Sequence, residues 1–167
     1  MRSDRSTRGF SLIELLLVLA ILGTLAAIAI PAYLAQRRRA RVIGDALSNA
    51  KVISMLMEQY KADNGTYGPA GATVTWTWGP TFNTPTLAGY PTNPCPGFVP
   101  NGNSQMNYFL QTGTTLNTAN GAITATDPNL TPPSLTFTIS ISDHTDPAGT
   151  IIVETNESGA VWKHVGY

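Results

Sequence analysis

The sequence predicts an α+β fold, with one long N-terminal helix packed on a small antiparallel β-sheet of about four strands. Residues 10–33 form an apolar stretch long enough to cross a bilayer. An apolar stripe then continues at helical spacing to about residue 62, and alternating strand patterns occupy much of the remaining chain. Elements segregated along a chain in this way are typical of α+β layers, in which a helix covers one face of a sheet.

The apolar stretch is predicted to be a single transmembrane helix. Glu14 is its only charged residue, and Ala, Leu and Ile dominate it. It is longer than the apolar core of a conventional signal peptide, and no small-residue cleavage site follows it. An unpaired carboxylate in a membrane helix costs roughly 2.5–3.5 kcal/mol on insertion scales. We therefore expect Glu14 to have a partner.

Basic residues flank the apolar stretch on both sides. Three arginines precede it, and a run of four follows it: Arg37, Arg38, Arg39 and Arg41. The run is predicted to be either a solvated collar at anionic membrane headgroups or a contact with acids on neighbouring subunits. DNA is the less favoured partner, because no aromatic residues interleave with the arginines. The Thr- and Asn-rich composition downstream indicates an exported C-terminal region.

Residues 34–62 continue the helix as an amphipathic half. Its apolar stripe consists of Val42, Ala46, Ala50, Ile53, Met57 and Tyr60, which are spaced by three or four residues. Arg41, Asp45, Asn49 and Glu58 fall largely off this stripe. The sequence DNGTY at residues 63–67 is a helix stop signal, and Gly65 is suited to a left-handed cap.

Residues 63–167 are predicted to form a globular, β-rich head. A turn-rich connection covers residues 68–103 and contains a short strand with Val74, Trp76 and Trp78 on one face. MNYFLQT and SLTFTISIS are predicted as strands. The second strand places Leu135, Phe137, Ile139 and Ile141 on one side with Ser and Thr opposite, which predicts one solvent-exposed face. GTIIVETNESGAVWKHV predicts a β-hairpin with its turn at residues 156–159.

The sequence contains no recognisable catalytic constellation, so neither enzymatic activity nor a cofactor is expected. It has no phosphate-binding glycine loop and no paired-cysteine metal site. Asp143, His144 and Asp146 share one predicted turn and are weak metal candidates, although Asp commonly begins turns through its own backbone hydrogen bonds. Cys95 is the single cysteine, which excludes an intrachain disulfide. We expect a small buried residue there rather than an intermolecular bridge.

The N-terminal segment RGFSLIELLLVLAILGTLAAIAIP resembles the class III leader of type IV pilins and of the pseudopilins of type II secretion. Gly9, Phe10, Glu14, Gly23 and Pro31 stand where the family pattern places them. The resemblance implies that residues 1–9 are a leader peptide. It also implies that a prepilin peptidase cuts between Gly9 and Phe10 and that the same enzyme N-methylates Phe10.

The resemblance also implies two roles within the first helix. In a filament, Glu14 would pair with the Phe10 amine of a neighbouring subunit, so that two charges that are costly in an apolar core offset one another. Such a buried pair is better suited to fixing register than to adding net stability. The segment between Gly23 and Pro31 would lose helical order on assembly, because both residues weaken a helix.

The function implied is that of a structural subunit of an extracellular type IV pilus, serving adhesion, twitching motility or DNA uptake. The chain would begin as a single-pass inner-membrane precursor and polymerise with itself and other pilins. An assembly platform and ATPases in the inner membrane would supply the work. One alternative is a pseudopilin of a periplasmic type II secretion pseudopilus, which YKADNGTY and the missing cysteine pair favour. Another is a membrane-anchored binding domain that forms no filament.

Overall fold

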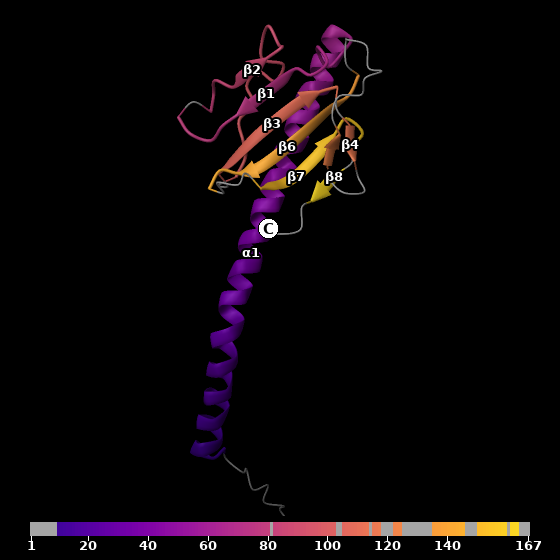
Figure 1. The fold of residues 1–167 in the computed structure, drawn as a ribbon. Coiled ribbons are helices and arrows are strands. Elements are labelled where there is room, and N and C mark those ends of the chain that lie inside the picture. The colour runs from indigo at the N-terminus through magenta and orange to yellow at the C-terminus, as the bar shows by residue number, and fades with distance from the viewer. Residues whose placement is uncertain are drawn as a thin grey trace, which may run out of the picture. The chain divides into compact units, whose positions relative to one another are not determined.

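The computed structural model describes residues 10–80, 82–102, 105–113, 115–117, 122–124, 135–145, 150–159 and 161–163 (Figure 1). These residues form one helix, α1 (Leu12–Asn64), and eight strands. The strands are β1 (Thr73–Trp76), β2 (Thr86–Ala88), β3 (Met106–Thr112), β4 (Thr115–Asn117), β5 (Ala122–Thr124), β6 (Phe137–Asp143), β7 (Ile151–Asn156) and β8 (Val161–Lys163). The predicted α+β class is confirmed.

The chain divides into two compact units, Met1–Ala40 and Arg41–Tyr167. In the first unit, the described element is the N-terminal part of α1. The second unit holds the remainder of α1 and all the described strands. The predicted divisions at residues 33 and 62 stay predictions.

α1 ends at the predicted stop signal. Gly65 adopts a φ of 79°, in the left-handed region that favours glycine. Its N–H donates to the Lys61 carbonyl at 2.7 Å, and the Asn64 side chain donates to the Tyr60 carbonyl at 2.9 Å. The Gly65 bond satisfies one of the carbonyls that the end of a helix leaves without an intrahelical partner, and the Asn64 side chain adds a bond to a carbonyl in the last turn. The Gly65 cap is therefore confirmed.

The main sheet has six antiparallel strands in the order β2-β1-β3-β6-β7-β8. Its centre is the long pair β3–β6, in register from Met106 opposite Asp143 to Thr112 opposite Phe137. β4 and β5 form a separate two-stranded sheet. The prediction of about four strands was too low, because β2 has three residues inside the turn-rich connection and is too short to show an alternating pattern.

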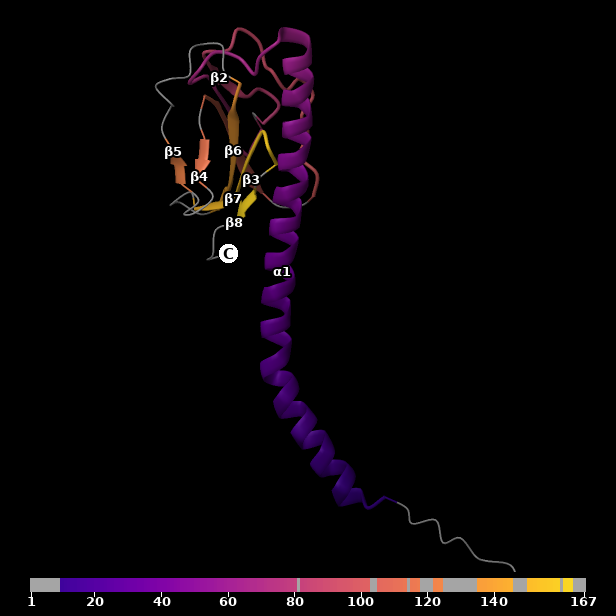
Figure 2. The same cartoon turned by 90° about the vertical axis from the view of Figure 1, so that its right-hand side faces the viewer.

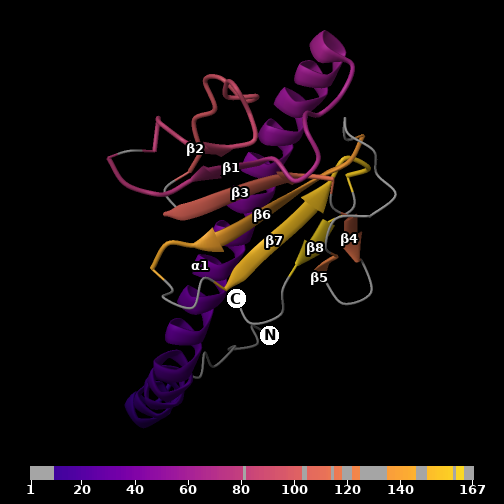
Figure 3. The same cartoon turned by 45° about the horizontal axis from the view of Figure 1, so that its top comes forward.

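One face of the main sheet packs on the C-terminal half of α1 (Figures 2 and 3). The helix contributes Ala46, Ala50, Ile53 and Met57, all of which are buried, and this confirms the predicted stripe. The sheet contributes the buried side chains of Val74, Trp76, Tyr108, Leu110, Phe137, Ile139, Ile141 and Val153. Trp78 follows β1 and packs against this core while partly exposed.

The expectation that β6 has a solvent-exposed face was wrong. Phe137 to Ile141 are all buried, including Thr138 and Ser140 on the side away from the helix. The small sheet accounts for part of this cover, since β4 lies against β6 and β7. Leu135, which the alternation placed with the core, precedes β6 and is 55% exposed. The alternation of apolar and hydroxyl side chains therefore predicted the strand correctly. It did not predict that another segment covers the second face of the strand.

Asn49 is a buried anchor for the connection between β2 and β3. Its side chain accepts from the Asn101 N–H at 2.7 Å and donates to the Asn101 carbonyl at 3.0 Å. It also donates to the Tyr108 hydroxyl at 2.8 Å. Burial raises the pKa of Tyr108 to about 12, although the Asn49 hydrogen bond acts in the opposite direction. The position of Asn49 off the apolar stripe had suggested a more exposed residue, yet it is 1% exposed.

We expect Asn49→Ala to lower the free energy of unfolding by about 3 kcal/mol, because it removes three hydrogen bonds and leaves the buried Tyr108 hydroxyl without its Asn49 partner. Urea unfolding of the full chain in detergent micelles, followed by tryptophan fluorescence, measures this loss, because Trp76 is buried in the core. Asn64→Ala is the control, because Asn64 is exposed and its side chain bonds the Tyr60 carbonyl at the helix end. The loss in this variant should stay below about 1 kcal/mol. Equal losses in the two variants would contradict the anchoring role.

Cys95 is a fully buried thiol, and burial raises its pKa to about 12 from an ordinary value of 9.0. The folded chain thus holds the thiol neutral over a pH range in which the unfolded chain ionises it. The contribution to stability is fully present below pH 9 and is lost as pH rises from 9 towards 12. The expectation of a small buried residue is confirmed.

We therefore expect the free energy of unfolding to begin falling near pH 9. The buried Tyr108, whose ordinary pKa is 10.0, adds to this fall only from about one pH unit higher. In Cys95→Ala the fall should begin only near pH 10. Urea titrations across this range measure both onsets. Labelling with a thiol reagent at pH 8 should be slow in the folded wild type and fast in urea. Rapid labelling of the folded chain would show that the thiol is accessible.

Candidate functional site

The N-terminal half of α1 has an apolar surface on all sides. Its large apolar side chains between residues 12 and 34 range from 47% exposed at Val18 to 76% exposed at Leu12 and Ile28. By length and composition, α1 is the one helix in the described residues that could cross a membrane, and none of its most apolar window is buried. So large an exposed apolar surface is unfavourable in water, and lipid or other apolar helices would cover it.

Glu14 lies in the first turn of this helix. The Ser11 carbonyl accepts the backbone N–H groups of Glu14 at 3.1 Å and Leu15 at 3.2 Å. Ser11 and Glu14 have the Ser-x-x-Glu spacing of a capping box, a signal of helix initiation that our sequence reasoning missed. A carboxylate here also lies near the positive end of the helix dipole. Within residues 10–40, no ion pair holds this carboxylate.

The predicted cleavage position lies at the edge of the described chain. Gly9 falls outside the described residues, and Phe10 is the first residue within them, with 84% of its surface exposed. The distance from Phe10 to Glu14 along the chain is four residues, about one helical turn. Pairing of Glu14 with a Phe10 amine stays a prediction.

Gly23 and Pro31 both lie inside the continuous helix of the single chain. Pro31 has no N–H to donate to the Ala27 carbonyl, so one helical bond is missing there. Close to Gly23, the Thr24 hydroxyl donates to the Ile21 carbonyl at 2.8 Å, a contact that competes with the helical bonds. The single chain is therefore helical at the segment whose loss of order in a filament is predicted.

The four arginines directly follow the apolar surface. Arg37, Arg38, Arg39 and Arg41 are all exposed. Arg37 and Arg41 are spaced by four residues in the sequence, which is about one helical turn. Among the residues that the structure describes, no carboxylate forms an ion pair with any of the four. They are therefore available to bind an acidic partner.

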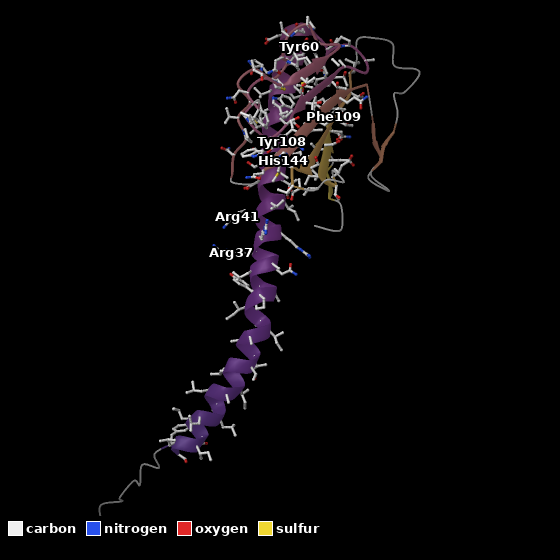
Figure 4. All side chains as sticks on the ribbon, turned by 60° about the vertical axis from the view of Figure 1, so that its left-hand side comes forward. Arg37, Arg41, Tyr60, Tyr108, Phe109 and His144 are labelled. Carbon is white, nitrogen blue, oxygen red and sulfur yellow. The ribbon has the colours of Figure 1, made fainter. Side chains whose placement is uncertain are left out.

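The turn after β6 is closed by Asp143. Its carboxylate accepts the Thr145 N–H at 2.8 Å and the Thr145 hydroxyl at 2.7 Å, as in an Asx turn. The backbone N–H of His144 donates to the Gln105 carbonyl at 3.1 Å, and the residue is exposed (Figure 4). Asp146 lies outside the described residues. The described part of the chain contains no group of three or more metal-ligating side chains.

Two comparisons with known proteins found similar sequences. The model of the prokaryotic N-terminal methylation motif matches residues 4–30. The chain is similar to the type IV wide pilus major component PilA4 of Thermus thermophilus, with 45% identity over 64 residues. The match covers 38% of this chain and 47% of the relative, so it spans about half of the relative's length. No solved structure matches.

The weak helical segment can be tested by hydrogen exchange in detergent micelles. We expect Pro31→Ala to stabilise the helix by up to about 3 kcal/mol and Gly23→Ala by about 1 kcal/mol, because each restores a better helix former. Amide exchange between residues 23 and 31 should slow in both variants, and more in Pro31→Ala. Ala40→Gly, beyond this segment, is the control and should leave exchange there unchanged. Unaltered exchange in Pro31→Ala would show that Pro31 does not weaken the helix.

Proposed function

Because this chain is a type IV pilin-like protein with the N-terminal methylation motif, we propose that it is a structural subunit of an extracellular type IV pilus. The observation that carries the proposal is the exposed apolar half of α1, which bears a single carboxylate, Glu14, within that motif. A surface that is apolar on all sides suits both storage in a bilayer and packing among copies of itself.

The proposed maturation begins with removal of residues 1–9. A prepilin peptidase cuts between Gly9 and Phe10, and the same enzyme methylates the new amine at Phe10. The cut creates a positive charge at the start of an apolar helix whose only acid is Glu14. In a filament, pairing with Glu14 of an adjacent copy offsets the cost of burying both charges. A wrong axial position leaves both unpaired, so the pair selects one register.

The proposed location changes during the life of the subunit. The precursor resides in the inner membrane with the N-terminal half of α1 in the bilayer. An assembly platform and its ATPases then extract the precursor into a helical filament. The filament consists of copies of this chain and can include other pilins. This chain supplies contacts rather than catalysis, which agrees with the absence of a recognisable catalytic motif in its sequence. Adhesion, twitching motility and DNA uptake are the functions to be tested for the resulting filament.

A second candidate is a pseudopilin of type II secretion. The observation favouring it is the end of the helix, where YKADNGTY resembles the corresponding segment of the major pseudopilin. The single cysteine also fits, since it cannot close a C-terminal loop by a disulfide. The long Thr-, Pro- and Asn-rich connection favours a pilin instead. A membrane-anchored monomer with no filament is the third alternative.

We expect sheared surface filaments of the native organism to contain this chain with Phe10 as its methylated first residue, as measured by mass spectrometry. In Glu14→Ala, filaments should fall by at least about a hundred-fold, because loss of one member of a buried charge pair costs roughly 3–5 kcal/mol. The membrane precursor should remain abundant. Asp63→Ala is the matched control, since Asp63 is an exposed acid at the other end of α1.

One outcome tests the proposed charge pair, and three others separate the candidates. Filaments that persist in Glu14→Ala with unchanged methylation would contradict the proposed pair. If deletion of the gene abolishes motility or transformation, the chain is a pilus subunit. If the deletion instead abolishes exoprotein release, the chain is a pseudopilin. A wild-type chain that stays in the membrane, uncut and without filaments, would leave only the anchored monomer.

A further inference from the structure

An apolar groove lies in the second unit, between α1 and the turn that joins β7 to β8. Its volume is about 310 Å³, and its wall is mostly carbon. On the helix side it is lined by Leu47, Ala50 and Met55, and on the sheet side by Val161. The helical lining extends from Leu47 to Glu58, which is about 16 Å along the helix axis.

The part of the chain that the structure describes leaves the groove uncovered. Met55 is 71% exposed and Val161 is 42% exposed, although Ala50 beside them is buried. Leu47, Lys51 and Met55 follow one another at intervals of four residues, so they form one face of α1. Apolar side chains gathered in a concave surface are typical of a docking site for another protein segment.

The rim of the groove carries more negative than positive charge. Glu58 and Glu157 line it with one lysine, Lys51. One oxygen of Glu58 accepts the Tyr67 hydroxyl at 2.5 Å, and one oxygen of Glu157 accepts the Phe137 N–H at 3.2 Å. These bonds hold both carboxylates in place, and the second oxygen of each can still accept from a cationic partner.

We infer that this groove receives residues 33–41 of a second copy of the chain. That segment begins with exposed Tyr33 and Leu34 and continues with the arginine run. Tyr33, Arg37 and Arg41 are spaced by four residues and lie on one helical face. The segment spans about 12 Å, which fits the length of the groove. Its apolar end would meet Leu47 and Val161. Its arginines would meet the two carboxylates and Met55, which lies one helical turn from Glu58.

The charges favour a protein partner over a lipid surface for this groove. Anionic headgroups would be repelled by the acidic rim, whereas arginine forms bidentate pairs with carboxylates. Helix-in-groove docking also uses anchors at the spacing found here. The inference rests on the proposed function, because a filament supplies second copies at high local concentration.

Photo-cross-linking in filaments of the full chain tests the inference. A photoreactive residue at position 55 should give a covalent dimer, with mass spectrometry mapping the second site to residues 33–41. The control is the same photoreactive residue at position 99, because Val99 is 66% exposed and is not part of the groove. It should give no such product. A cross-link to lipid, to another segment or to nothing at position 55 would overturn the inference.

Charge at position 55 provides the second measurement. Met55→Lys should lower filament yield by at least about ten-fold, since it places a like charge against the arginines. Met55→Glu should retain most of the yield, and Arg37→Glu with Arg41→Glu should partly restore Met55→Lys. Val99→Lys is the control and should match wild type.

The two proposals fail in different ways. If wild-type filaments form but both substitutions of Met55 have the same effect, or the arginine reversals do not restore Met55→Lys, the groove inference alone is wrong. If the arginines bind only lipid headgroups, Arg37→Glu with Arg41→Glu lowers the amount of membrane precursor both in wild type and in Met55→Lys. It then does not restore the filament yield of Met55→Lys, and this result also overturns the groove inference. A wild-type chain that forms no filament overturns the proposed function and this inference with it.

Discussion

The physical constraint on which this molecule depends is that one helix must satisfy two different surroundings. Between residues 12 and 34, α1 exposes large apolar side chains on all sides. Between residues 46 and 57, its apolar residues form one stripe that is buried under the sheet. The second half can therefore be stable in water with its sheet, whereas the first needs lipid or other apolar helices. The proposed function depends on whether lipid or other apolar helices cover the first half.

The single acid of that apolar half has a local role at the helix start and a proposed long-range role in the filament, and the free energies involved differ. At the helix start, a carboxylate gains typically 0.3–1 kcal/mol from the dipole. The cost of a charge inside the bilayer is roughly 2.5–3.5 kcal/mol on insertion scales. The local gain at Glu14 is thus smaller than the cost of burial. Helix capping alone does not account for an acid here, and in the proposed filament a cationic partner would offset the remainder.

The sequence predicted those features that depend on a single period or a single turn. The stripe through Ala46 and Met57 and the Gly65 cap follow from helical spacing and from glycine's access to positive φ. The cover over Ser140 and the burial of Asn49 could not be predicted in this way, because they depend on which distant segment arrives there. Hydroxyl and amide side chains suit a wet surface and a hydrogen-bonded interior equally well. The exposed helix and its lone acid were evident from composition, whereas the groove beside Met55 required the folded hairpin.

The head divides the C-terminal half of α1 into three sides. One side, with Ile53 and Met57, is covered by the sheet. A second side is covered by the connection between β1 and β3: Asn49 bonds Asn101, and the ring of Tyr60 meets that of Tyr90 edge-on, with centroids 6.0 Å apart. The third side, which carries Met55, has neither cover. Anchoring the connection through buried polar groups fixes which side remains open. In the proposed filament, such a head would present one defined apolar face of its helix to the neighbouring copy, and a defined face is what a repeating assembly requires.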